Sequence, residues 1–176
     1  FFFSTFYTLN QAIHTSLVAN KTGLSVQTVA LTANNLALLD RITAHPHSAE
    51  YLQSALNSGP LARYGYYGEA PVGVLLLEPV EGKRGKNSTP VALKVALLCV
   101  LPAYRSTFGV EKTLLEYALE TAKARHLSTI VFPVVKNNVD EIAEILADLK
   151  FSQCATCAGV NVTAHENEIL FVRELE

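Results

Sequence analysis

The feature that most constrains the fold is a nearly continuous apolar run from Val91 to Leu101, in the middle of the chain. A run of this length and composition is typical of a central strand buried on both faces of a sheet. Val110 to Ala124 follows with apolar residues at helical spacing, and 128–135 is rich in β-branched residues. This strand–helix–strand order predicts a local parallel crossover.

The flanking segments predict antiparallel pairing around that unit. Strands at 62–67 and 71–78 form a hairpin through the turn at Tyr67-Gly68-Glu69. Further elements are expected as a helix at 5–19, a strand at 25–31, a helix at 32–42 capped by Thr32, a short helix capped by Ser48, a helix at 140–149, and closing strands at 152–160 and 168–175. The expected fold class is therefore α/β, with a mixed, mostly antiparallel sheet and helices on both faces.

Composition suits one cytoplasmic domain. With 176 residues and 49% hydrophobic content, the chain can bury a core without disulfides. A net charge of −2 gives the chain no overall electrostatic attraction for nucleic acid. No apolar run of about 18 residues predicts a membrane span, and no basic region precedes the apolar start as in a signal peptide. Three cysteines favour a reducing compartment, and Cys154 with Cys157 lacks the second pair that a structural zinc site needs. No metal site is expected.

The residues from Val100 to Arg105, Val-Leu-Pro-Ala-Tyr-Arg, carry a family resemblance. They resemble the end of the long strand in GNAT acetyltransferases, where a loop of the form Arg/Gln-x-x-Gly-x-Gly/Ala leads into a helix. The resemblance implies acetyl-CoA as cofactor, with its diphosphate on backbone N–H groups at that helix N-terminus. It implies these candidate cofactor contacts: Cys99, Val100, Arg105, Ser106, Thr107, Phe108, Gly109, Val110 and Asn138.

A narrower resemblance covers roughly residues 25–175. The segments 31–36, 61–74 and 98–115 are similar to NatE-type N-alpha-acetyltransferases, which associate with the NatA complex on ribosomes. The expected domain division is residues 1–24 as an N-terminal helix and linker, and 25–176 as the acetyltransferase-like domain. The partners implied are NatA-type catalytic and auxiliary subunits, the ribosome through that complex, and a nascent-chain N-terminus if the chain is active.

The phosphate loop departs from the family pattern. Without a gap, Phe108 and Val110 stand at its two small-residue positions; with one inserted residue, Gly109 and Glu111 stand there. Either alignment places a large or acidic side chain where diphosphate is expected, and a carboxylate would repel it. Both alignments remain open from the sequence.

The catalytic and substrate positions depart as well. The family's catalytic tyrosine and histidine correspond to Lys94 and Pro133, and proline has no side chain that moves a proton. Its substrate loop, Phe-Pro-Val-x-Tyr, corresponds to 45–49, which leaves Pro46 and His47 as candidate substrate contacts. No catalytic residue is therefore assigned.

These departures predict a NatE-like subunit with weakened or lost acetyl-CoA-dependent activity and a mainly auxiliary role. An α-amino group is partly neutral at pH 7, so a missing base alone need not abolish transfer. Two alternatives stay open: an active N-terminal acetyltransferase, and a small-molecule N-acetyltransferase.

Overall fold

A single mixed sheet organises the molecule. The computed structural model describes residues 18–19, 24–82, 89–155, 157 and 159–176. Within them the sheet has eight strands in the order β1-β2-β3-β4-β5-β6-β8-β7. These are β1 (Val18–Ala19), β2 (Ser25–Ala30), β3 (Ala62–Tyr67), β4 (Ala70–Glu81), β5 (Pro90–Val100), β6 (Thr129–Val135), β7 (Ser152–Cys154) and β8 (Glu168–Glu174). Only β5 and β6 pair in parallel among these strands.

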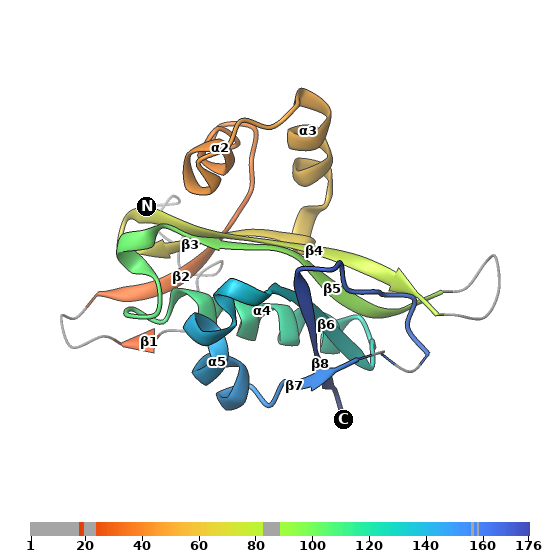
Figure 1. The fold of residues 1–176 in the computed structure, drawn as a ribbon. Helices are drawn as coiled ribbons and strands as arrows, with labels where there is room; N and C mark the ends of the chain where they lie inside the picture. The colour runs from red at the N-terminus through yellow and green to blue at the C-terminus, as the bar shows by residue number, and fades with distance from the viewer. Residues whose placement is uncertain (1–17, 20–23, 83–88, 156, 158) are drawn as a thin grey trace, which may run out of the picture.

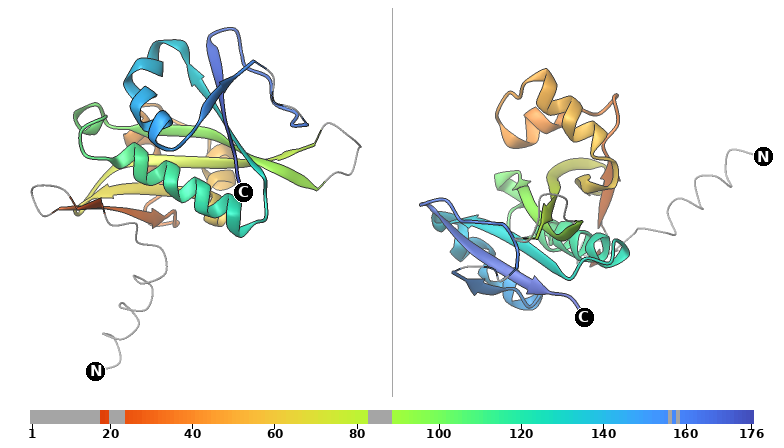
Figure 2. Two further views of the ribbon diagram at one scale, coloured as in Figure 1. Left: turned by 90° about the horizontal axis from the view of Figure 1, so that it is seen from below. Right: turned by 90° about the vertical axis from the view of Figure 1, so that its right-hand side faces the viewer.

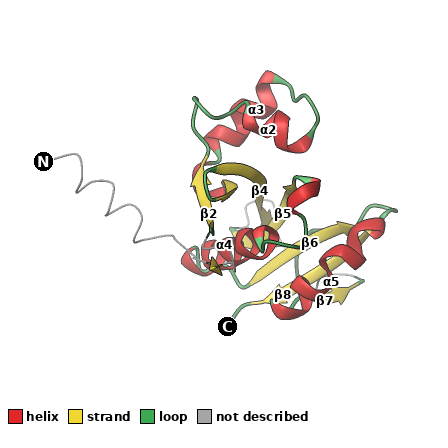
Figure 3. Ribbon diagram, turned by 90° about the vertical axis from the view of Figure 1, so that its left-hand side faces the viewer, coloured by secondary structure: helices red, strands yellow, loops and turns green. Residues whose placement is uncertain are grey.

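Helices cover both faces of this sheet (Figures 1 and 3). The helices α2 (Leu38–Thr43) and α3 (Ala49–Asn57) lie on one face, and α4 (Val110–Ala124) and α5 (Val139–Asp148) lie on the other. Short 3-10 turns occupy Gly59–Leu61, Pro102–Tyr104 and Lys136–Asn138. Each face has its own core: Leu39, Ile42 and Tyr64 belong to the α2/α3 side, while Leu114 and Ile130 belong to the α4/α5 side. The expected fold class is confirmed.

The central crossover is also confirmed. Helix α4 has the predicted bounds, and its apolar stripe is buried against the sheet because it repeats with the period of a helix. Figure 2 shows α4 lying along the sheet. Ser48 caps α3 as predicted, accepting a hydrogen bond of 3.1 Å from the Tyr51 backbone N–H.

Several predicted elements were wrong in their bounds. Thr32 does not cap a helix, because the Asn35 side chain holds a turn there, bonding the Thr32 N–H at 2.8 Å and the Ala30 carbonyl at 3.0 Å. Helix α2 therefore begins at Leu38. Strand β7 ends at Cys154, since Val160 bridges Gly82 instead. Val18–Ala19 is a strand, and the rest of the predicted first helix lies outside the described residues, as does the polar loop at 83–88.

A glycine pair sets how closely α4 approaches the sheet. Gly65 of β3 and Gly73 of β4 are cross-strand partners. A Cβ at either position would lie 2.9 Å from Cγ1 of Val110, at the start of α4. The bare backbone at these two positions lets the first turn of α4 pack directly on the strands. No helix in the described part of the chain has the length and apolar character to span a bilayer.

Candidate active site

A cavity of about 310 Å³ opens where β5 and β6 part. The parallel ladder between these strands ends at the pair Lys94 and Val131. Beyond it, the residues from Val95 to Val100 on β5 and from Phe132 to Val135 on β6 line the cavity. Consecutive residues of a strand point to opposite faces, so this lining means that the cavity follows the parted strand edges. Backbone groups on these edges can pair with a ligand that carries amides of its own.

A bulge shapes the β5 wall. Leu76 pairs with Leu97 and Leu77 pairs with Val95, which leaves Ala96 as the extra residue. A bulge of this kind bends its strand and leaves the inserted residue without a ladder partner. The bulge at Ala96 closely follows the last β5–β6 pair, at Lys94, so β5 bends where it separates from β6.

The junction from β5 to α4 forms one end of the cavity. After β5 the chain makes the Pro102–Tyr104 turn and enters α4 at Val110. Ser106 and Gly109 have left-handed φ angles of 57° and 76°, and Gly109 is the residue before the helix. A helix N-terminus preceded by such a loop presents backbone N–H groups to an anion.

Glu111 already supplies an anion at this position. It is the second residue of α4, only 7% exposed, and its Oε1 accepts a hydrogen bond of 3.0 Å from the Ser106 backbone N–H. Its Oε2 is buried without a hydrogen-bond partner among the described residues. A carboxylate in the first turn is favoured by about 0.3–1 kcal/mol through the helix dipole. The carboxylate therefore already occupies one of the backbone N–H donors in the loop before α4.

Phe108 and Val110, which the ungapped alignment places at the small-residue positions, turn their side chains away from the cavity. The Phe108 ring packs 4.6 Å from that of Tyr67 and 5.6 Å from that of Tyr104, between centroids. Val110 is fully buried against the glycine pair. Both side chains belong to the core of the α4/α5 side, whereas Glu111 lines the cavity.

Arg105 and Cys99 lie together on the cavity wall. The Arg105 Nε donates to the Val100 carbonyl at 2.8 Å, which folds its side chain back on the end of β5. Burial raises the pKa of the Cys99 thiol, and the nearby Arg105 only partly opposes that rise. The thiol is therefore protonated at neutral pH and is not suited to act as a nucleophile.

The two positions matched to the family's catalytic pair carry no free base. Lys94 Nζ lies 3.7 Å from Glu78 Oε2, its cross-strand neighbour on β4. Pro133 lines the cavity with a ring that can neither donate nor accept a proton.

The structure brings together part of the predicted cofactor set. Cys99, Val100, Arg105, Ser106 and Asn138 line the cavity; Thr107, Phe108, Gly109 and Val110 lie outside its wall. Sequence reasoning did not find Glu141 and Glu168, which also line it. They come from α5 and the start of β8, and no spacing in the sequence relates them to the phosphate loop.

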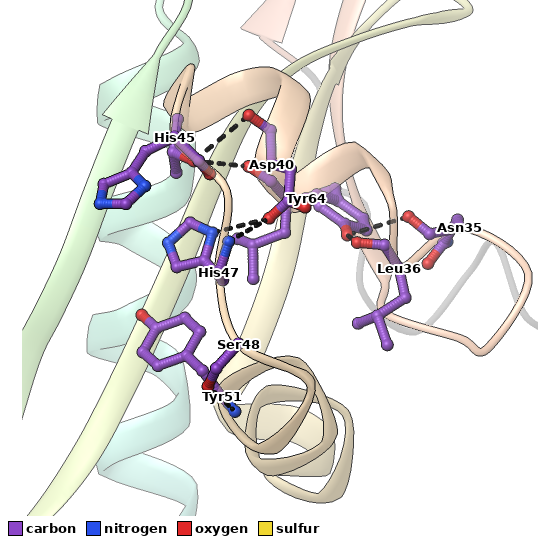
Figure 4. A network of polar contacts seen from close by, with 10 residues as sticks. Asn35, Leu36, Asp40, His45, His47, Ser48, Tyr51 and Tyr64 are labelled. Carbon is purple, nitrogen blue, oxygen red and sulfur yellow. Dashed lines mark hydrogen bonds and ion pairs between the residues drawn. The ribbon is translucent and has the colours of Figure 1, made fainter.

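The two predicted substrate contacts, Pro46 and His47, lie in the α2–α3 loop. The helices α2 and α3 cover the face of the sheet opposite α4 and α5 (Figure 1), and Figure 4 shows His47 in this loop. Pro46 is exposed. The His47 side chain is 15% exposed, and its Nδ1 lies 2.8 Å from Oδ1 of Asp40. The Asp40 partnership is a further feature that sequence reasoning missed.

Three solved structures are similar to this chain in their fold. No family model matches the sequence, and no curated protein matches it. Arabidopsis thaliana Naa50, in complex with the bisubstrate analogue CoA-Ac-MVNAL, has a TM-score of 0.63 at 18% identity, over 85% of this chain and 99% of that one. The GNAT domain of S. lividans PAT has a TM-score of 0.67 at 15% identity, over 91% and 96%. This chain has the GNAT fold.

A third GNAT-fold neighbour comes from the NatC complex bound to Gag peptide and CoA, with a TM-score of 0.63 at 16% identity over 86% of this chain and 99% of that chain. At these identities the likeness concerns the GNAT fold itself. The activity of this chain must be argued from its own cavity.

Proposed function

We propose that the chain is a NatE-like GNAT subunit of a NatA-type N-terminal acetyltransferase complex, with weakened or lost acetyl-CoA-dependent activity and a mainly auxiliary role. The observation that carries this proposal is the hydrogen bond between the Glu111 carboxylate and the Ser106 backbone N–H. This internal anion competes for the donors of the diphosphate cradle and repels the phosphates that would enter it.

The rest of the cavity supports acetyl-CoA as the group for which it is shaped. The separated edges of β5 and β6 offer backbone amides that can pair with amides of the ligand. Arg105 and Asn138 offer side-chain donors at the cavity wall. Acetyl-CoA, when bound, would supply the activated acetyl thioester. The residues that would hold it are the cavity-lining Cys99, Val100, Arg105, Ser106 and Asn138. The fit is partial, because Glu111, Glu141 and Glu168 lie on the same walls.

The auxiliary role is proposed from what the chain keeps and what it lacks. It keeps the fold and a formed cavity, whereas Lys94 and Pro133 stand at the catalytic positions. The similarity in fold to Naa50 and to a chain of the NatC complex supports an N-terminal acetyltransferase setting. NatA-type subunits, and the ribosome through them, are the partners we propose for a cytoplasmic protein of this kind.

The test is a thermal-shift titration of the full chain with acetyl-CoA, with desulfo-CoA as a second ligand. We expect no saturable rise in the unfolding midpoint at micromolar concentrations. A saturable micromolar rise would overturn the impaired-cofactor proposal and favour an active enzyme. Co-purification with purified NatA-type subunits tests the auxiliary role, and failure of the full chain to bind them would contradict it.

A further inference from the structure

A histidine–carboxylate pair in the α2–α3 loop has no role in the cofactor site. The Asp40 Oδ1 lies 2.8 Å from Nδ1 of the His47 ring and also accepts the His47 backbone N–H at 3.1 Å. One oxygen thus fixes both the loop and the ring (Figure 4). Because a carboxylate only accepts, Nδ1 carries the proton, and Nε2 of the neutral ring bears the lone pair.

Stacking fixes the plane of the ring. His47 lies between Tyr51, at 4.6 Å and 16°, and His45, at 5.3 Å and 25°, measured between ring centroids and planes. The three rings lie on the same side of the loop in Figure 4. Nε2 of His47 makes no hydrogen bond to any described residue. The ring is held on one nitrogen and open on the other, which is the arrangement of a positioned base.

Two contacts place this loop over the cavity-lining stretch of β5. Before the loop, the Ile42 carbonyl accepts a bond of 3.5 Å from Sγ of Cys99, a residue of the cavity wall. After the loop, burial raises the pKa of Tyr51, and the nearby Glu78 carboxylate adds to that rise. Glu78 is the cross-strand partner of Lys94, which directly precedes the first lining residue, Val95. His47 lies in the chain between these two anchors.

We propose that His47 is the general base for the acceptor amine, with Asp40 as its positioning residue. This deepens the proposed function and rests on it, since it concerns acetyl transfer at the reduced level argued above. The amine nitrogen attacks the thioester carbonyl, so a C–N bond forms and the C–S bond breaks. His47 Nε2 takes the proton from the nitrogen and returns it to the departing thiolate, which leaves as the thiol.

With His47 as the base, acetyl transfer can proceed although position 133 holds a proline. Pro133 cannot take a proton, and Lys94 is paired with Glu78. The α2–α3 loop lies on the face of the sheet opposite α4 (Figure 1), and in this proposal it supplies the base from that face.

The test is N-acetylation by the full chain at saturating acetyl-CoA, using a peptide with a free N-terminus and detecting product mass against a no-protein blank. We expect His47→Gln to lower kcat by about 100-fold, at the lower end of general-base effects, with KM nearly unchanged. Asp40→Asn should also lower kcat. His126→Gln, an exposed histidine at the far end of α4, should leave both constants unchanged.

Added imidazole should restore part of the rate of His47→Ala, which a purely structural role would not permit. Unchanged kcat in His47→Gln, absence of imidazole rescue, or no product above the blank in the wild type would each overturn the proposal. The thermal-shift titration with acetyl-CoA is run on the same variants. It separates the two proposals: an unchanged rate in His47→Gln contradicts only the base, whereas a saturable micromolar rise in the wild-type midpoint contradicts only the impaired-cofactor proposal.

Discussion

The backbone N–H of Ser106 donates a hydrogen bond of 3.0 Å to Oε1 of Glu111, five residues further along the chain. The donor lies in the loop before α4 and the acceptor in its first turn, so the bond closes the cradle that the junction would otherwise offer to an anion. The second oxygen of Glu111 is buried and unpartnered within the described structure. Leaving such a group unpaired costs about 1–3 kcal/mol, so this closure is held at some expense of stability.

Adding a side chain to the glycine pair under α4 should destabilise the protein. Gly65→Ala should lower the free energy of unfolding by about 1–3 kcal/mol, because its Cβ would lie 2.9 Å from Val110 Cγ1. Denaturant unfolding measures the change. Gly82→Ala is the matched control, since its nearest neighbour would be at an ordinary 3.5 Å. In the Val110→Ala background the Gly65→Ala penalty should shrink; an equal penalty there would contradict this account.

Tyr64 should make the protein sensitive to alkaline pH. Burial raises the pKa of its hydroxyl from 10.0 to about 12. Between those values the unfolded chain has lost the proton that the folded chain keeps, so stability should fall as pH rises from about 10 to about 12. Tyr64→Phe should lessen this decline. At neutral pH it should cost about 1 kcal/mol through loss of the 3.0 Å bond to the Asn35 carbonyl. A decline of the same size in both proteins would count against Tyr64 as its source.

The Cys99 thiol should react slowly with alkylating reagents. Burial raises its pKa, while Arg105 opposes the rise. The pH midpoint of its alkylation rate should therefore lie above that of a free cysteine peptide. In Arg105→Ala that midpoint should move higher still, because the cation that favours the thiolate is gone. Mass spectrometry of the Cys99 peptide gives the rate, and a midpoint that falls in Arg105→Ala would refute this assignment.

Much of the fold could be predicted because its signals are local. The apolar period of α4 and the β-branched content of β6 lie within single segments, and both elements were confirmed. Strand β7 was predicted too long, because the pairing of Val160 with Gly82 depends on a hairpin about 80 residues away in the chain. A pairing between residues so far apart in the chain produces no periodic pattern in the sequence.

The site was predictable only in part for the same reason. The motif ending at Arg105 indicated the junction, but two alignments placed different residues at the cradle. The contacts of these residues depend on tertiary packing: Phe108 turns to Tyr67, and Glu111 lies at the Ser106 amide. The hydrogen bond from His47 to Asp40 joins a loop to the helix before it, and neither the residue types nor their spacing in the sequence predicted this contact.

The most direct measurement is calorimetric titration of acetyl-CoA into the wild-type chain and into Glu111→Gly and Glu111→Gln. Removing the carboxylate should tighten binding at least tenfold, since the repulsion between like unit charges about 4 Å apart is worth several kcal/mol at a protein surface and about 1.4 kcal/mol is tenfold. Glu120→Gln, exposed on the same helix, controls for net charge. Weak wild-type binding with that gain is the predicted result; micromolar wild-type binding that Glu111→Gly leaves unchanged would contradict the account.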